Sequence, residues 1–129
     1  MKRVFGLYRM DGSYAISRLH PDEKMPQWAP VSRMSFTSRT EDELSIICEE
    51  GSVPDFVRAE RGWACFKLQG PFPLNEVGVL ASVLRPLAEA GISILACSSF
   101  DTDYVFVRRT DLKKAEKALL EAGHWFVDE

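Results

Sequence analysis

Two stretches with the periodicity of an amphipathic helix, set among strand-like runs, limit the fold of this chain most strongly. The first covers residues 75–90, where apolar side chains recur at spacings of three and four: Val77, Leu80, Leu84 and Leu87. Gly91 follows this stretch and predicts a left-handed helix end. Pro86 lies inside it, removes a hydrogen bond to the carbonyl of Ser82 and predicts a kink.

A second helix is predicted over residues 111–122, capped by Thr110 or Asp111 and ended by Gly123. Four runs rich in β-branched and aromatic residues surround the two helices and predict strands: 63–69, 92–98, 104–108 and 124–128. The order is therefore strand, helix, strand, strand, helix, strand. This order is typical of a ferredoxin-like α+β fold with an antiparallel sheet.

The first half of the sequence repeats five of these elements in a reduced form. Strands are predicted at residues 14–19, 32–39 and 44–49. Thr40 and Glu43 have the form of a helix capping box, but the strand-forming residues 45–48 follow directly, so a hairpin turn is favoured between the last two strands. Three prolines allow at most one helical turn in the connection that follows the first of these strands. Pro54 favours another short helix, in the segment GSVPDFVRA at residues 51–59.

The dipeptide Asp11-Gly12 is a strong hairpin signal and predicts that residues 4–8 pair with residues 14–19. Leu7 would then lie opposite Ile16. The strand at residues 4–8 takes the position of the final strand that the first half lacks, so the first copy of the unit is circularly permuted. We therefore expect two domains, at residues 1–59 and 60–129.

Charge and cysteine usage argue against several classes of function. The net charge is −3 with both signs interspersed, so the chain lacks the basic patch of a nucleic-acid-binding protein. No apolar run approaches the ~20 residues of a membrane helix, and no signal peptide is recognised. Three cysteines without a Cys-x-x-Cys pair predict reduced, buried thiols and a cytoplasmic location. His20 and His124 have no companions at zinc-ligand spacing, and no cofactor fingerprint is found.

The stretch NEVGVLASVLRPLAEAGISI, residues 75–94, resembles the first helix of ACT domains, βαββαβ modules that sense amino acids. The family pattern is an Asp, a Gly-apolar-Leu helix start and later a Gly-Ile-x-Ile strand. Gly78-Val79-Leu80 and Gly91-Ile92-Ser93-Ile94 fit this pattern, whereas Asn75 stands where the family has Asp. Residues 39–50 and 98–112 are similar to free-standing tandem-ACT proteins and to the ACT pairs of cytosolic arginine sensors.

The resemblance implies two ACT-like units that form a non-catalytic regulatory module. It also implies a small-molecule ligand, an amino acid, bound without a cofactor at an interface between ACT units. A homodimer and a target protein are the expected protein partners, and the homodimer follows from the expected geometry of the ligand site, given below. No nucleic acid and no membrane are expected as partners.

The chemistry of two segments agrees with an amino-acid ligand. Unpaired N–H groups at the start of the first helix attract a carboxylate, while Asp101 or Asp103 can accept an ammonium group and nearby hydroxyls add neutral hydrogen bonds. The predicted ligand-binding residues are Asn75, Glu76, Val77, Gly78, Val79, Leu80, Ser98, Ser99, Phe100, Asp101, Thr102 and Asp103. We expect the helix start and residues 98–103 to lie at opposite ends of one unit, so that a shared site requires two units or two chains.

Other interpretations of the same residues stay open at this point. Gly78 is equally consistent with close packing of helix and strand, Phe100 with a core position in contact with a partner sheet, and the two aspartates with turn hydrogen bonds. A protein–protein interaction domain without a small ligand is the main alternative function. An enzyme with a divalent metal on Asp101, Asp103 and Asp111, and an RNA-binding sheet, are less favoured.

Overall fold

The computed structural model describes residues 3–127 and divides them into two compact units. We call the first the helical unit; it contains the chain up to Asp11 and again from Ala64 onward. We call the second the strand unit; it runs from Gly12 to Trp63. The long strand β5 (Ala59–Leu68) contributes residues to both units. The domain boundary that the sequence places between residues 59 and 60 stays a prediction.

The helical unit has a five-stranded sheet in the order β6-β7-β5-β1-β8. Besides β5, its strands are β1 (Gly6–Arg9), β6 (Ile94–Ser98), β7 (Asp103–Arg108) and β8 (Trp125–Phe126). Its helices are α1 (Val79–Glu89), the 3₁₀ turn η3 (Arg109–Asp111) and α2 (Leu112–Glu121). These elements confirm the strands and helices predicted for the second half, with α1 beginning four residues later. Asp128, the last residue of the predicted final strand, lies outside the described residues.

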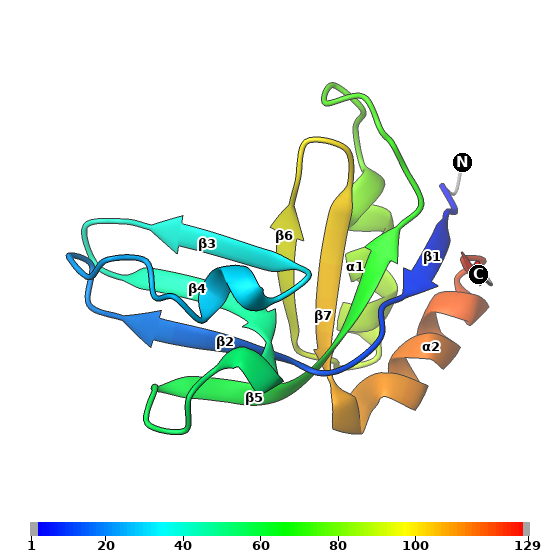
Figure 1. Ribbon diagram of the computed structural model, residues 1–129. Helices are drawn as coiled ribbons and strands as arrows, with labels where there is room; N and C mark the ends of the chain where they lie inside the picture. Colours follow the sequence, from blue (N-terminus) through cyan, green and yellow to red (C-terminus); the bar gives the residue numbers. More distant parts are fainter. Residues whose placement is uncertain (1–2, 128–129) are drawn as a thin grey trace. The chain divides into compact units, whose positions relative to one another are not determined.

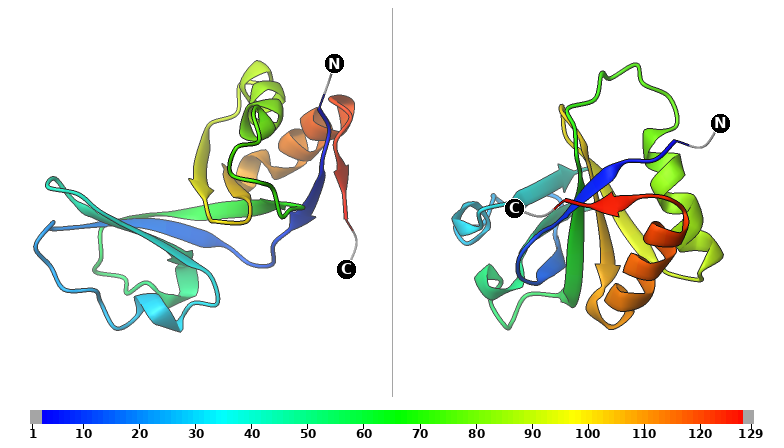
Figure 2. Two further views of the ribbon diagram at one scale, coloured as in Figure 1. Left: turned by 90° about the horizontal axis from the view of Figure 1, so that it is seen from above. Right: turned by 90° about the vertical axis from the view of Figure 1, so that its right-hand side faces the viewer.

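Helices α1 and α2 lie on the same face of this sheet (Figure 2). The core between the layers consists of apolar side chains that the helical and strand periodicities direct inward: Leu7, Ala64, Phe66, Leu68, Val79, Val83, Leu87, Ile92, Val105, Val107, Ala115 and Leu119. Complete burial of one Leu or Val side chain stabilises a fold by roughly 1.5–3 kcal/mol. This core therefore holds both helices against the sheet.

The ends of α1 are set by two glycines with positive φ angles. Gly78 precedes the helix at φ 82°, and Gly91 follows it at φ 74°. The N–H of Ile92 bonds to the carbonyl of Leu87, and that of Gly91 to the carbonyl of Ala88, each at 3.0 Å. This is the Schellman arrangement, so the left-handed helix end predicted at Gly91 is confirmed. The kink predicted at Pro86 stays a prediction.

The partner predicted for the strand at residues 4–8 is wrong. Strand β1 pairs antiparallel with β5, with Leu7 opposite Leu68, and parallel with β8. Leu7 is fully buried in the core of the helical unit. Gly12 has the expected positive φ of 87°, but the chain there connects β1 to β2 (Tyr14–Leu19) without pairing them. Burial of one face of β1 decides its partner, and a local turn signal carries no information on that burial.

The strand unit has its strands in the order β3-β4-β2-β5. Its further elements are β3 (Ser35–Arg39), β4 (Leu44–Glu49) and the 3₁₀ turns η1 (Ala29–Val31) and η2 (Glu50–Ser52) (Figure 1). The hairpin predicted between β3 and β4 is confirmed, because Thr40 donates its N–H to the carbonyl of Glu43 at 2.9 Å. The short helix predicted around Pro54 is wrong: η2 ends before it, and only a turn follows.

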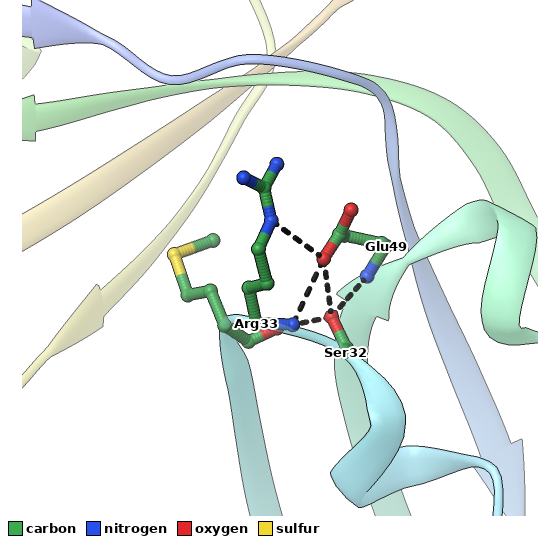
Figure 3. A network of polar contacts seen from close by, with 4 residues as sticks. Ser32, Arg33 and Glu49 are labelled. Atoms are coloured by element: carbon green, nitrogen blue, oxygen red, sulfur yellow. Dashed lines mark hydrogen bonds and ion pairs between the residues drawn. The ribbon is translucent and has the colours of Figure 1, made fainter.

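A network of polar contacts holds the connection before β3 against the end of β4 (Figure 3). The carboxylate of Glu49 accepts a hydrogen bond from the N–H of Arg33 at 2.9 Å, and the Glu49 N–H donates to Ser32 Oγ at 2.9 Å. The Arg33 side chain adds an ion pair at 3.7 Å. The backbone hydrogen bond from Arg33, followed by its charge and the Ser32 hydroxyl, lowers the pKa of Glu49 despite partial desolvation.

Candidate functional site

A cavity of about 340 Å³ opens at one end of the helical unit. Its lining residues come from the connection between β5 and α1, the start of α1 and the connection between β6 and β7. Figure 1 shows both connections at the upper end of this unit. Ten of the twelve predicted site residues line it: Glu76, Gly78, Val79, Leu80, Ser98, Ser99, Phe100, Asp101, Thr102 and Asp103. Asn75 and Val77 are not among its lining residues.

The expectation that the helix start and residues 98–103 lie at opposite ends of one unit is wrong. Strand β5 carries the chain to the end where α1 begins, α1 returns it, and β6 carries it back to that first end. The turn between the antiparallel strands β6 and β7 therefore lies beside the start of α1. One chain supplies both walls of the cavity, so the geometric argument for a site between two units or two chains no longer holds.

The start of α1 presents backbone donors to the cavity. No side chain in the described part of the chain caps the helix, and the first hydrogen bond of its ladder runs from the N–H of Ser82 to the carbonyl of Gly78 at 3.1 Å. The N–H groups of Val79, Leu80 and Ala81 precede that bond and have no partner one turn back. All three residues line the cavity. The helix dipole adds a positive partial charge at this point, which favours an anionic group.

Gly78 allows the backbone to adopt a left-handed conformation at this site. Its φ of 82° disfavours any side chain, and a Cβ added to it would meet nothing within 4 Å. The close-packing interpretation of Gly78 is therefore wrong. The open space in front of Gly78 leaves the helix start accessible.

The connection between β6 and β7 forms the opposite wall. Its shape depends on Thr102, which is 5% exposed and donates its hydroxyl to the carbonyl of Leu68 at 2.8 Å. The N–H of Ser99 bonds to the carbonyl of Thr102 at 2.8 Å. Phe100, by contrast, is 79% exposed and is not part of the core of the helical unit, so its interpretation as a core residue against a partner sheet stays a prediction.

A glycine allows the two connections to approach each other. A Cβ on Gly70 would lie 2.9 Å from the carbonyl oxygen of Asp101, which is too close for a real side chain. That carbonyl also accepts a hydrogen bond from the N–H of Phe72 at 2.8 Å. Four residues that sequence reasoning missed line the cavity: Phe72, Pro73, Leu74 and Ala81. The apolar run Pro71-Phe72-Pro73-Leu74 was the available signal, although Phe72 also packs against the core of the helical unit.

Carboxylates are the only charged side chains on the cavity wall among residues 3–127: Glu76, Asp101 and Asp103. Glu76 forms an ion pair with Arg3, and Asp103 accepts a hydrogen bond from the hydroxyl of Ser98. The Asp101 carboxylate has no hydrogen-bond or ion-pair partner within the described part of the chain. Backbone donors on one wall, with the carboxylates of Asp101 and Asp103 on the other, match the two charged ends of a zwitterion.

Other kinds of site are less well supported. Asp111 is the N-cap residue of α2 and does not line the cavity, and the described residues contain no group of three or more possible metal-ligating side chains. The thiols of Cys48, Cys65 and Cys97 are free, and burial raises the pKa of each above its ordinary value. No helix within residues 3–127 is long and apolar enough to cross a bilayer.

Two solved structures resemble this chain over nearly its whole length. A crystal structure of a protein from Agrobacterium tumefaciens is 42% identical, covers 98% of this chain and 95% of its own, and superimposes with a TM-score of 0.92. The ligand-free regulatory subunit of aspartate kinase from Thermus thermophilus is 14% identical, with a TM-score of 0.65, covering 94% of this chain and 99% of its own. At that identity the second likeness shows the fold alone.

Sequence comparisons identify the parts of the chain. Bovine cytosolic arginine sensor for mTORC1 subunit 1 (Bos taurus) is 32% identical over 98 residues, which are 68% of this chain and 30% of that protein. The chain thus spans less than a third of this relative. A family model for an N-terminal domain matches residues 12–55, and the ACT domain model matches residues 58–121. The α+β fold with ACT-like units is thereby confirmed, and the chain belongs to the ACT domain family.

Proposed function

We propose that this protein is a non-catalytic regulatory module that binds a free amino acid in the cavity of the helical unit. One observation supports the proposal: a single cavity joins the start of α1 to the carboxylate of Asp101, and within residues 3–127 this carboxylate has no partner and the helix start has no side-chain cap. The ligand carboxylate accepts hydrogen bonds from the N–H groups of Val79, Leu80 and Ala81. Its ammonium group faces Asp101 and Asp103.

The wall charges also favour one class of side chain on the ligand. One carboxylate balances the α-ammonium group, and a second then faces the ligand side chain. A cationic side chain gains from that charge, whereas an acidic one is repelled. Arginine and lysine should therefore bind more tightly than aspartate and glutamate. The relative named as an arginine sensor supports this preference.

A second chain is proposed to cover the mouth of the cavity and to form a homodimer. Three large apolar side chains are exposed around the start of α1 and the β6–β7 connection, and two of them line the cavity: Leu74, Val77 and Phe100. Burial of such side chains is a usual reason for association. We place the protein in the cytoplasm, where free thiols stay reduced, and expect neither nucleic acid nor a membrane among its partners.

The same apolar rim favours a second candidate function, an assembly domain that binds another protein without any small ligand. The two candidates differ in what stabilises the isolated protein. Only a small-molecule ligand raises the free energy of unfolding without a partner protein, by about 2.7 kcal/mol at a hundredfold excess over Kd.

A thermal-shift screen with the twenty common amino acids tests the proposal. For a chain of this size the expected gain raises the Tm by several degrees for the best ligand. Arginine and lysine should give the largest shifts and aspartate the smallest. Flat curves across the panel, together with self-association or capture of a partner chain, would establish the assembly domain instead.

A further inference from the structure

The strand unit contains a cavity of its own, of about 650 Å³. It lies between the end of β2, the connection that follows β2, and the segment immediately before β5. All of its lining residues belong to the strand unit. Its volume falls within the range of pockets that bind small organic molecules.

Two arginines face each other across the sheet at this cavity. The N–H of Arg18 bonds to the carbonyl of Arg58 at 3.0 Å. The register set by the pairs Ile16–Glu60 and Ser17–Ala59 places Arg18 directly opposite Arg58. Opposing residues of an antiparallel pair project from the same face, and like charges in such positions destabilise the sheet. An anion bound between the two guanidinium groups removes this repulsion.

The charged residues around the cavity also favour an anionic ligand. Lys24 adds a third cation, and among the described residues that line the cavity only Glu23 has an acidic side chain. Within the described part of the chain, Arg18, Lys24 and Arg58 form no ion pair with a carboxylate. The printed side-chain bond of Arg18 goes to the carbonyl of Asp42, at 3.1 Å. This local excess of positive charge occurs in a protein whose net charge is −3.

Aromatic side chains accompany the cations. Trp28 lines the cavity and packs in part against the core of the strand unit. Phe56 lines it as well and is 89% exposed. Aromatic rings in such positions stack with a planar group, and guanidinium planes stack on the same kind of ring. The lining is therefore suited to a molecule that is both anionic and flat.

We infer that this cavity binds a small organic anion that carries a planar ring. Its phosphate or carboxylate group lies between Arg18 and Arg58 with Lys24 nearby, and the ring contacts Trp28 and Phe56. The site lies in the strand unit and shares no lining residue with the amino-acid cavity. The inference is therefore independent of the proposed function and stands if the amino-acid screen fails.

Calorimetric titration of the full chain with matched probes tests the inference at low ionic strength. Adenosine 5′-monophosphate and naphthalene-2-carboxylate contain both features with different anionic groups, whereas adenosine and inorganic phosphate each contain one. At least one of the first two should bind at least tenfold more tightly than either single-feature probe. Amide shifts in a titration followed by NMR should concentrate at residues 18–28 and 56–58. No saturable binding of either two-feature probe, or equal binding of phosphate alone, would overturn the inference.

Variants of the cavity residues separate the contribution of the anionic group from that of the planar ring. Arg58→Ala should weaken the two-feature probes at least tenfold, whereas Lys113→Ala, on α2 in the helical unit, should leave binding unchanged. Without any probe, Arg58→Ala should leave the Tm equal or raise it, because it removes the repulsion of Arg18. A lowered Tm would show that Arg58 already has a stabilising partner within the protein and would count against an anion site. Phe56→Ala should weaken the two-feature probes and adenosine but not phosphate.

Discussion

The Nε2 of His124 lies 3.0 Å from the carbonyl oxygen of Ser82, the acceptor that Pro86 leaves without its usual partner in α1. The other ring nitrogen, Nδ1, accepts a hydrogen bond from the N–H of Phe5 at 3.0 Å, so the proton is on Nε2. His124 is 3% exposed. A buried imidazole thus restores the hydrogen bond that a proline removes from the helix.

Replacing His124 with Phe should lower the free energy of unfolding by roughly 1–3 kcal/mol. The aromatic ring keeps its stacking against Phe5, while the Ser82 carbonyl and the Phe5 N–H lose their partner. Urea denaturation of the wild type and the variant measures the difference.

A double-mutant cycle with Pro86→Ala isolates the contribution of the Ser82 carbonyl. Alanine restores an N–H that bonds to this carbonyl within the helix, so His124→Phe should cost about 1 kcal/mol less in that background. An equal cost in both backgrounds would mean that the bond from His124 to Ser82 contributes nothing to stability.

Gly78→Leu should abolish the Tm increase caused by the best amino acid of the screen. The side chain would project into the open space before α1 and obstruct the backbone donors. Because φ is 82° there, the substitution should also cost about 1–2 kcal/mol of stability. Gly62→Leu is the matched control: Gly62 has φ 81° and open space around it, but lies outside the cavity. A preserved ligand response in Gly78→Leu would remove the helix start from the site.

Asp103→Asn should weaken the best amino acid roughly 10- to 100-fold, because a charge-assisted hydrogen bond to its ammonium group is lost. Asp101→Asn should act in the same direction. The N-acetylated form of the same amino acid has no ammonium group, so its weaker binding should change little. Calorimetric titration measures both ligands, with Asp55→Asn in the strand unit as the control. Equal losses for the two ligands would exclude Asp103 as the ammonium acceptor.

Glu49→Gln should reduce stability near neutral pH and have a smaller effect in acid. The folded-state pKa of Glu49 is lowered, so its carboxylate stabilises the fold above the unfolded pKa of about 4.3 and loses this contribution as pH falls through the folded pKa. Urea denaturation at pH 7 and at pH 3 measures the difference between wild type and variant. Glu41→Gln, at an exposed turn position, should show no comparable change. A difference that does not shrink in acid would contradict the assignment.

Local signals predicted most elements of the helical unit correctly. The spacing of Leu80, Leu84 and Leu87, the glycine at position 91 and the β-branched residues of β7 act through neighbours in the chain, and those neighbours are visible in the sequence. The first turn of α1 was predicted too early. Propensity alone does not indicate that the chain before Gly78 is held by Phe72 against the carbonyl of Asp101.

The sequence by itself therefore determined where helices and strands form and which residue types the candidate site contains, because periodicity and turn chemistry are local properties. Tertiary structure alone decided that β1 pairs with β5 and β8, that the start of α1 and the β6–β7 turn share one cavity, and that Arg18 faces Arg58. Each of these depends on residues that are far apart in the chain. Burial of side chains and the direction of each crossover select such pairings, and neither is encoded in a short stretch of sequence.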